Sequence, residues 1–423
     1  MSPALQIASV LALVAAFVGG IAGLRSFGQR RAWHAEVQRK IVHVAAGGLA
    51  MALPWLLPNQ WQVWLLLGLT TLAMLGLRSR SLAGIGAAVH GVARASWGDL
   101  TMLAAIAMLF VLHQDQPILY VLPLAILTLA DAAAALAGLR YGRIFYTTED
   151  GQKSIEGSAI LFLVALIIAM VCLLLLTDVP RPAVIAIGLA IAAFATVLEA
   201  DSWQGFDNLF LPMGVYLLLF TTLEASASEA ALRVALLLAA AAAMFFASRG
   251  VGHGGHVARV HALAVFLLLT VVSPANAVLP AVLFLAPALF ATGPVPPRQT
   301  LGTVASLALV AFGFLAIGPA TGFTAINFFA LAAAGLTLAT LIRSASQLVI
   351  VLAGPVLWGL WRGVVALNPP PADWPGPMGA AAALALVVSF AGAWWTRRSD
   401  PRLAALAGLG PATLLYFVYA VLQ

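Results

Sequence analysis

The chain has 423 residues, of which 63% are hydrophobic and only 9% are charged. A soluble core does not need so much apolar sequence, and many windows of about 20 residues, the length of a membrane-spanning helix, carry no charge. The formal net charge of +6 does not indicate a nucleic-acid partner, because the basic residues lie in short segments between apolar ones, where membrane insertion explains them.

The apolar segments are expected to be helices, because backbone polar groups in hydrocarbon must be paired within their own segment. The sequence therefore predicts an all-α polytopic membrane protein with about sixteen transmembrane helices, the first of which starts near the N-terminus and is not a cleaved signal peptide. In chain order the predicted spans are 4–24, 41–57, 61–77, 99–113, 118–139, 158–177, 183–199, 209–223, 231–247, 259–273, 277–291, 301–317, 324–342, 346–366, 378–395 and 402–421.

The charges between these spans predict their orientation. With the N-terminus outside, most arginines and both lysines fall in cytoplasmic loops, as the positive-inside rule requires. We therefore expect a multi-pass protein of the cell (inner) membrane with an active site that faces the cytoplasm.

The acidic residues are unevenly distributed along the chain. Thirteen of fifteen lie before residue 230, and only Asp373 and Asp400 follow. Because phosphate and metal chemistry needs carboxylates, we predict a catalytic membrane domain at 1–225 and a second helical membrane domain at 226–423. The second domain would be a degenerate repeat without catalytic acids if the chain consists of two parallel eight-helix halves.

A short sequence similarity supports such a repeat. LTLADAAAALAGLRYG (127–142) aligns with LTLATLIRSASQ (336–347), and Ala339 falls near Asp131. Chance similarity between two segments rich in alanine and leucine explains this equally well.

Three polar side chains open the second span. Arg39, Lys40 and His43 share one helical face through their spacing of three and four residues. They form a candidate nucleotide-binding face, although His43 is also consistent with a neutral histidine at the membrane interface.

The fifth span carries Asp131 about two turns from its cytoplasmic end. A carboxylate there is costly unless it meets water, a metal or a cation, so it is a functional candidate; a helix–helix hydrogen bond is the alternative. Gly138 and Gly142 permit close helix packing. Arg140 and Arg143 either bind phosphate or anchor the helix at the membrane surface.

The segment DGQKSIEGS (150–158) contains Lys153, one of only two lysines in the chain. Together with Ser154 it precedes a helix, whose N-terminus favours anions. Lys153 would therefore contact phosphate, and Glu156 would hold Mg²⁺ or position Lys153.

A second acidic segment follows the seventh span. Glu199, Asp201 and Asp207 occupy an inside loop without positive charge, which a bound divalent cation explains better than packing. Magnesium takes few protein carboxylates and completes its coordination with water and phosphate oxygens.

These blocks, in this order, resemble the dolichol kinase and phytol kinase family of CTP-dependent membrane lipid kinases. The matching segments are RKIVH (39–43), DAAAALAGLRYGR (131–143), KSIEGS (153–158) and Glu199 with DNLFLP (207–212), which cover about the first half of the chain. The resemblance implies phosphoryl transfer from CTP or another nucleoside triphosphate to an isoprenoid alcohol in the bilayer, with Mg²⁺.

The resemblance, together with the residue patterns, gives a set of candidate site residues. They are Asp131, Lys153 and Glu156 for catalysis; Arg39, Lys40, His43, Arg140, Arg143, Lys153, Ser154 and Asn208 for nucleotide binding; and Asp131, Glu199, Asp201 and Asp207 for the metal.

Two alternatives remain open. The CDP-diacylglycerol synthases (phosphatidate cytidylyltransferases) share part of this pattern and continue with GHGG and an acid-rich segment. Here GHGG (252–255) is followed by Ala258-Arg259-Val260-His261, without those acids. A transporter would suit two parallel halves, but its acids would be expected near the membrane midplane.

Overall fold

A computed structural model describes residues 2–57, 59–77, 97–113, 116–148, 151–201, 204–224, 226–250, 253–268, 275–321, 326–368 and 378–422. Asp373 and Gly252 lie outside these residues, as do the ends of the predicted spans at 259–273 and 324–342. The described chain is helical apart from one short hairpin, and it divides into two compact units, Met1–Val234 and Ala235–Gln423.

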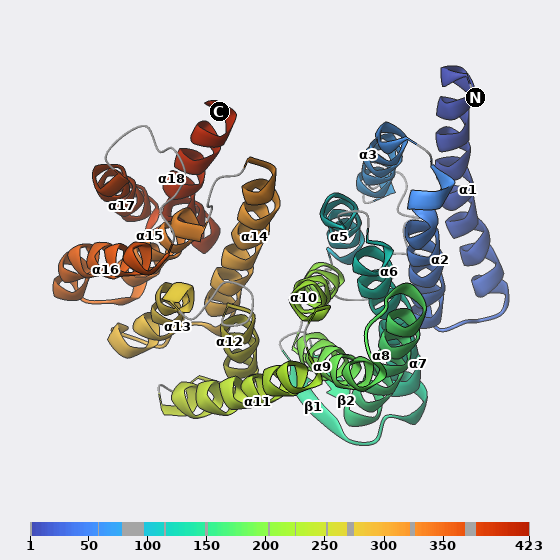
Figure 1. Ribbon diagram of the computed structural model, residues 1–423, viewed down its shortest axis with the longest axis horizontal. Helices are drawn as coiled ribbons and strands as arrows, with labels where there is room; N and C mark the ends of the chain where they lie inside the picture. The colour runs from blue at the N-terminus through green and yellow to red at the C-terminus, as the bar shows by residue number, and fades with distance from the viewer. Residues whose placement is uncertain are drawn as a thin grey trace. The chain divides into compact units, whose positions relative to one another are not determined.

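Unit 1 contains the residues that the sequence singles out. Its elements are α1 (Pro3–Arg30), α2 (Ala35–Leu56), α3 (Gln60–Leu77), α5 (Gly98–Leu112), α6 (Pro117–Ala125), the π-helical turn η2 (Ile126–Ala130), α7 (Asp131–Tyr141), β1 (Phe145–Thr148), β2 (Gly151–Ser154), α8 (Ile155–Leu176), α9 (Arg181–Ala200), α10 (Asp207–Thr222) and the start of α11 (Ala227–Gly250) (Figure 1). Helix α10 packs against α5, α6 and α9, and α2 packs against η2 and α7.

Glycines set the close crossing of α7 and α8. A Cβ atom added at Gly157 would lie 3.0 Å from the Ala134 carbonyl oxygen and 3.4 Å from the Gly138 Cα atom. One added at Gly142 would lie 3.0 Å from the Cβ atom of Ser154, the N-cap of α8. The predicted role of the glycines in close packing therefore agrees with the structure, and this packing fixes where the segment after α7 begins.

The all-α architecture is confirmed, and the segment after α7 adds one short hairpin to it. Strands β1 and β2 form an antiparallel hairpin in which Tyr146 pairs with Lys153. Helix α8 begins at Ile155, three residues before the predicted span, and its N-cap is Ser154, whose Oγ accepts the Gly157 N–H at 3.1 Å. Lys153 thus lies on a strand immediately before the helix.

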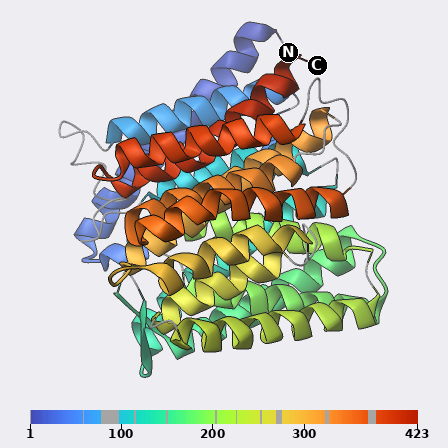
Figure 2. The same cartoon turned by 90° about the vertical axis from the view of Figure 1, so that its left-hand side faces the viewer.

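Unit 2 is a helical bundle around α15 (Ile326–Ser344), whose residues are almost all buried. Helix α15 packs against α13 (Val278–Phe290), α16 (Gln347–Leu367), α17 (Met378–Thr396) and α18 (Pro401–Leu422). The remaining elements are α12 (Gly255–Leu267), the 3₁₀ turn η4 (Ala275–Ala277) and α14 (Pro297–Thr321). Figure 2 shows these helices, coloured from yellow to red, lying roughly side by side.

The number of membrane spans is smaller than expected. Among the described residues, nine helices are long and apolar enough to cross a membrane, and three further apolar helices are shorter. The predicted span at 99–113 is the 15-residue helix α5, which is about 22 Å long, whereas a hydrocarbon core is about 30 Å thick. The protein is therefore a multi-pass membrane protein, but the count of about sixteen spans is wrong by this criterion.

Candidate active site

Helix α2 directs two basic side chains at Asp131. Lys40 Nζ lies 2.6 Å from Asp131 Oδ2, and both side chains are buried. His43 Nε2 lies 3.5 Å from the same oxygen and 3.0 Å from the Leu127 carbonyl oxygen. The structure thus pairs two predicted nucleotide-binding residues, Lys40 and His43, with the carboxylate of the fifth predicted span.

The backbone before Asp131 is a π-helical turn. The Asp131 N–H donates to the Ile126 carbonyl five residues earlier, while the Leu127 carbonyl faces His43. Such turns occur often at functional sites, because they redirect a side chain within an otherwise regular helix. Helix α2 comes close at this point, since a Cβ atom added at Gly47 would clash with Thr128 Oγ1. The turn therefore presents Asp131 to α2.

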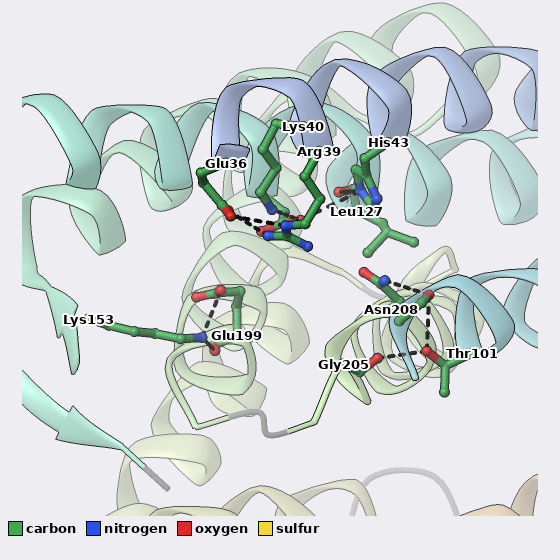
Figure 3. Close-up of polar contacts among 12 residues, drawn as sticks. Glu36, Arg39, Lys40, His43, Thr101, Leu127, Lys153, Glu199, Gly205 and Asn208 are labelled. Carbon is green, nitrogen blue, oxygen red and sulfur yellow. Dashed lines mark hydrogen bonds and ion pairs between the residues drawn. The ribbon is translucent and has the colours of Figure 1, made fainter. Parts of the chain in front are cut away.

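Lys153 and Glu199 form a second ion pair. Lys153 Nζ lies 2.8 Å from Glu199 Oε1 and also donates to the Glu199 backbone carbonyl (Figure 3). Burial alone would lower the pKa of Lys153, but the carboxylates of Glu199 and Asp207 outweigh it and raise that pKa above its ordinary value. Lys153 therefore stays protonated beside two carboxylates.

Three carboxylates lie close together beside these two ion pairs. Asp131, Glu199 and Asp207 each offer an oxygen atom, and these atoms all lie within 4.8 Å of one another. Oxygen ligands about 2.1 Å from Mg²⁺ span about 4.2 Å across the ion, so the carboxylates fit one such ion after small side-chain movements. These three residues would hold the metal. Asp201, the fourth predicted ligand, is buried at the end of α9 and is not part of this group within the described chain.

The loop before Asp207 is held by α5. The Asn208 side-chain amide donates to the Gly98 carbonyl at 2.7 Å, and Thr101 Oγ1 donates to the Gly205 carbonyl at 2.6 Å. Asn208, a candidate nucleotide-binding residue, thus joins α10 to α5, and its role toward a nucleotide stays a prediction. Gly98 and Thr101 were not predicted, because they lie more than a hundred residues from the loop they hold and no local motif marks them.

Two further candidate site residues, Glu156 and Ser154, form hydrogen bonds with nearby backbone N–H groups. The Glu156 carboxylate accepts the backbone N–H groups of Arg143 at 3.0 Å and of Ile144 at 3.3 Å, which joins the start of α8 to the segment before β1. Ser154 caps α8. The structure places neither in the group of three carboxylates, so its geometry favours positioning roles for both.

The three predicted arginines differ in exposure: Arg39 is partly buried, whereas Arg140 and Arg143 are exposed. Arg39 pairs with Glu36, with Nη2 2.6 Å from Oε1, and Figure 3 shows this pair next to Lys40. Arg140 is exposed and lies over the Tyr141 ring, and Arg143 is also exposed. Of these arginines, Arg39 lies nearest the carboxylates.

The arrangement as a whole suits a metal-bound polyphosphate. Oxygen ligands for a divalent cation stand beside a lysine, and such a combination can neutralise the charge of phosphate oxygens.

Comparison with known proteins gives one informative match. The chain is 30% identical over 184 residues to a protein named phytol kinase from Synechocystis sp., and the match covers 43% of this chain and 76% of that protein. No protein-family model matches the chain, and no solved structure matches it.

Proposed function

The chain belongs to the phytol kinase family, and from this premise we propose that it transfers the γ-phosphoryl group of CTP, or of another nucleoside triphosphate, to the hydroxyl group of an isoprenoid alcohol. The observation that carries the proposal is the convergence of Asp131, Glu199 and Asp207 beside Lys153. Phosphoryl transfer depends mainly on positioning and on neutralising phosphate charge, and these side chains are suited to both tasks.

In the proposed reaction, the alcohol oxygen forms a bond to the γ-phosphorus atom. The bond from that phosphorus to the bridging oxygen breaks, and its electron pair leaves with the nucleoside diphosphate. The alcohol proton passes to the Asp131 carboxylate, which Lys40 and His43 hold in place. Lys153 faces the phosphates, and Mg²⁺, when bound, supplies further positive charge to their oxygens.

The hydrophobic tail of the alcohol would lie in the bilayer beside α7. Leu136 and Leu139 are exposed on this helix, within a few turns of Asp131. An isoprenoid chain in the membrane would then reach the site from the side, between spans, without leaving hydrocarbon. The loop charges support a site on the cytoplasmic face of the cell membrane.

The test is transfer of label by the purified full-length protein in detergent or lipid. CTP labelled at the γ-phosphate is supplied with phytol, geranylgeraniol, a polyprenol or diacylglycerol, with Mg²⁺ or with a chelator. We expect γ-label in the lipid extract with an isoprenoid alcohol, and no transfer with the chelator.

Two results would contradict the proposal. Transfer of label from the α-phosphate of CTP to phosphatidate would indicate a cytidylyltransferase. Absence of transfer to every alcohol, together with nucleotide-independent flux of a solute in proteoliposomes, would indicate a transporter.

A further inference from the structure

The chain contains only two lysines, and both contact the carboxylates of the candidate active site. Lys40 Nζ lies 2.6 Å from Asp131 Oδ2, and Lys153 Nζ lies 2.8 Å from Glu199 Oε1. The other side chains that are always cationic are arginines. The two ammonium groups therefore bind two of the three carboxylates that would also hold a metal.

These two ion pairs disfavour the binding of a divalent cation when no nucleotide is present. Three carboxylates and two ammonium groups leave one net negative charge, and the ammonium groups repel a dication that approaches the same carboxylates. A polyphosphate brings several negative charges and offers the lysines other acceptors. The metal is therefore held more strongly when it arrives together with the nucleotide.

The two lysines differ in their freedom to change partner. Lys40 and Asp131 are buried, with 3% and 6% of their side chains exposed, so that pair is fixed. The Lys153 side chain is 23% exposed and extends from a short hairpin on a flexible four-carbon stem. Lys153 is thus the lysine that can move from Glu199 to a phosphate oxygen.

We propose that Lys153 couples metal binding to nucleotide binding, because it occupies Glu199 until a polyphosphate accepts its ammonium group. The inference rests on the proposed function only in taking a nucleoside triphosphate as donor. It gives Lys153 two opposed effects: this residue weakens binding of the metal alone and strengthens binding of the metal–nucleotide complex.

The first arm of the test measures Mn²⁺ alone on the full-length protein, from the free-ion signal in electron paramagnetic resonance. The variants are Lys153→Met and, as a matched control, Arg181→Met. Arg181 and Glu199 lie at opposite ends of α9, about 27 Å apart along its axis. Lys153→Met should bind Mn²⁺ at least about tenfold more tightly than wild type, because a repelling charge is gone. Arg181→Met should match wild type.

The second arm measures retention of labelled CTP with saturating Mn²⁺ or with a chelator. Lys153→Met should retain less CTP than wild type in the presence of Mn²⁺, so the substitution moves the two affinities in opposite directions. Lys153→Gln, a polar replacement, should behave in the same way, and equal elution on size exclusion verifies the fold of each variant.

The inference is overturned if Lys153→Met binds Mn²⁺ no more tightly than Arg181→Met, or if it retains CTP as well as wild type does. These results are separable from the proposed reaction. If wild type phosphorylates no alcohol while the two affinities still move in opposite directions, the reaction is wrong and the coupling stands. If wild type is an active kinase and the affinities do not move, only the coupling is wrong.

Discussion

The residues Leu-Thr-Leu-Ala occur at 127–130 in unit 1 and at 336–339 in unit 2, and the two copies have different backbones. The first copy belongs to the π-helical turn η2, and the second lies within the regular helix α15. Thr337 Oγ1 donates to the Ala333 carbonyl one turn earlier at 2.7 Å. Its counterpart, Thr128 Oγ1, is buried and has no hydrogen-bond partner in the described part of the chain.

The difference comes from what faces each segment. In unit 1 the Leu127 carbonyl faces the His43 ring of α2, which draws it out of the helical hydrogen-bond pattern. In unit 2 the Leu336 carbonyl accepts a bond from Thr340 of its own helix. The same four residues are thus regular where they only pack, and irregular where they present a carboxylate to partners on another helix.

The largest effect on turnover is expected at the residue that directly follows each Leu-Thr-Leu-Ala segment. Asp131 follows the first copy and Thr340 the second. Asp131→Asn removes the proposed proton acceptor and a metal ligand, so turnover should fall by roughly 10²–10⁴-fold. Thr340→Ala should leave turnover within about twofold, because its hydroxyl bonds only to its own helix. Initial rates of lipid phosphorylation measure both, and equal losses would end the distinction between the units.

A second large effect is expected at Lys153. Lys153→Arg keeps the charge but replaces a compact ammonium group by a planar fork, which does not fit the same acceptors at Glu199. Turnover should fall by roughly 10²-fold, the usual loss for one misplaced charge-stabilising donor. The reverse exchange in unit 2, Arg343→Lys, should have little effect. Near wild-type turnover of Lys153→Arg would remove its phosphate role.

A smaller effect is expected at the contact between α2 and η2. Gly47→Ala would place a methyl group against Thr128 Oγ1, whereas Gly48→Ala meets nothing within 4 Å. Overpacking of this kind costs about 1–3 kcal/mol, so Gly47→Ala should lower the unfolding temperature and turnover together. Gly48→Ala is the matched control. Identical melting curves and rates for both variants would show that the close approach of α2 is not required.

The smallest effect is expected at Glu156, which the sequence suggested as a catalytic residue. Its carboxylate accepts backbone N–H groups, and the amide oxygen of Glu156→Gln can accept the same bonds. We expect a loss of less than about tenfold in turnover, because a positioning contact is weakened but not removed. A loss comparable to that of Asp131→Asn would restore the catalytic role and make the observed contacts secondary.

Much of the site could be predicted because its residues are chemically unusual for their place. Asp131 stands out within an apolar span, and Glu199 and Asp207 stand out in a loop without positive charge; the structure brings these three together. Their roles in metal binding stay predictions. Composition likewise identifies a helical membrane protein, because apolar segments of this length have few other uses.

The features that could not be predicted from the sequence depend on contacts between distant segments or on short local structures. The pairing of Lys40 with Asp131 joins residues 91 positions apart, and one sequence does not show which helices pack together. The hairpin has strands of only four residues, too short for a clear alternating pattern. The π-helical turn has no local signal at all, since the same residues form an ordinary helix at 336–339.

We expect the metal to bind the carboxylates of unit 1. Replacing Mg²⁺ by Fe²⁺ in the full-length protein, with ascorbate and peroxide, cleaves the backbone next to the bound ion, and mass spectrometry identifies the cut positions. We predict cuts around Asp131 and between Glu199 and Asp207, suppressed by excess Mg²⁺ and lost in Asp207→Asn. Cuts confined to unit 2, for example around His253 and His261, would show that the metal binds elsewhere and not at these carboxylates.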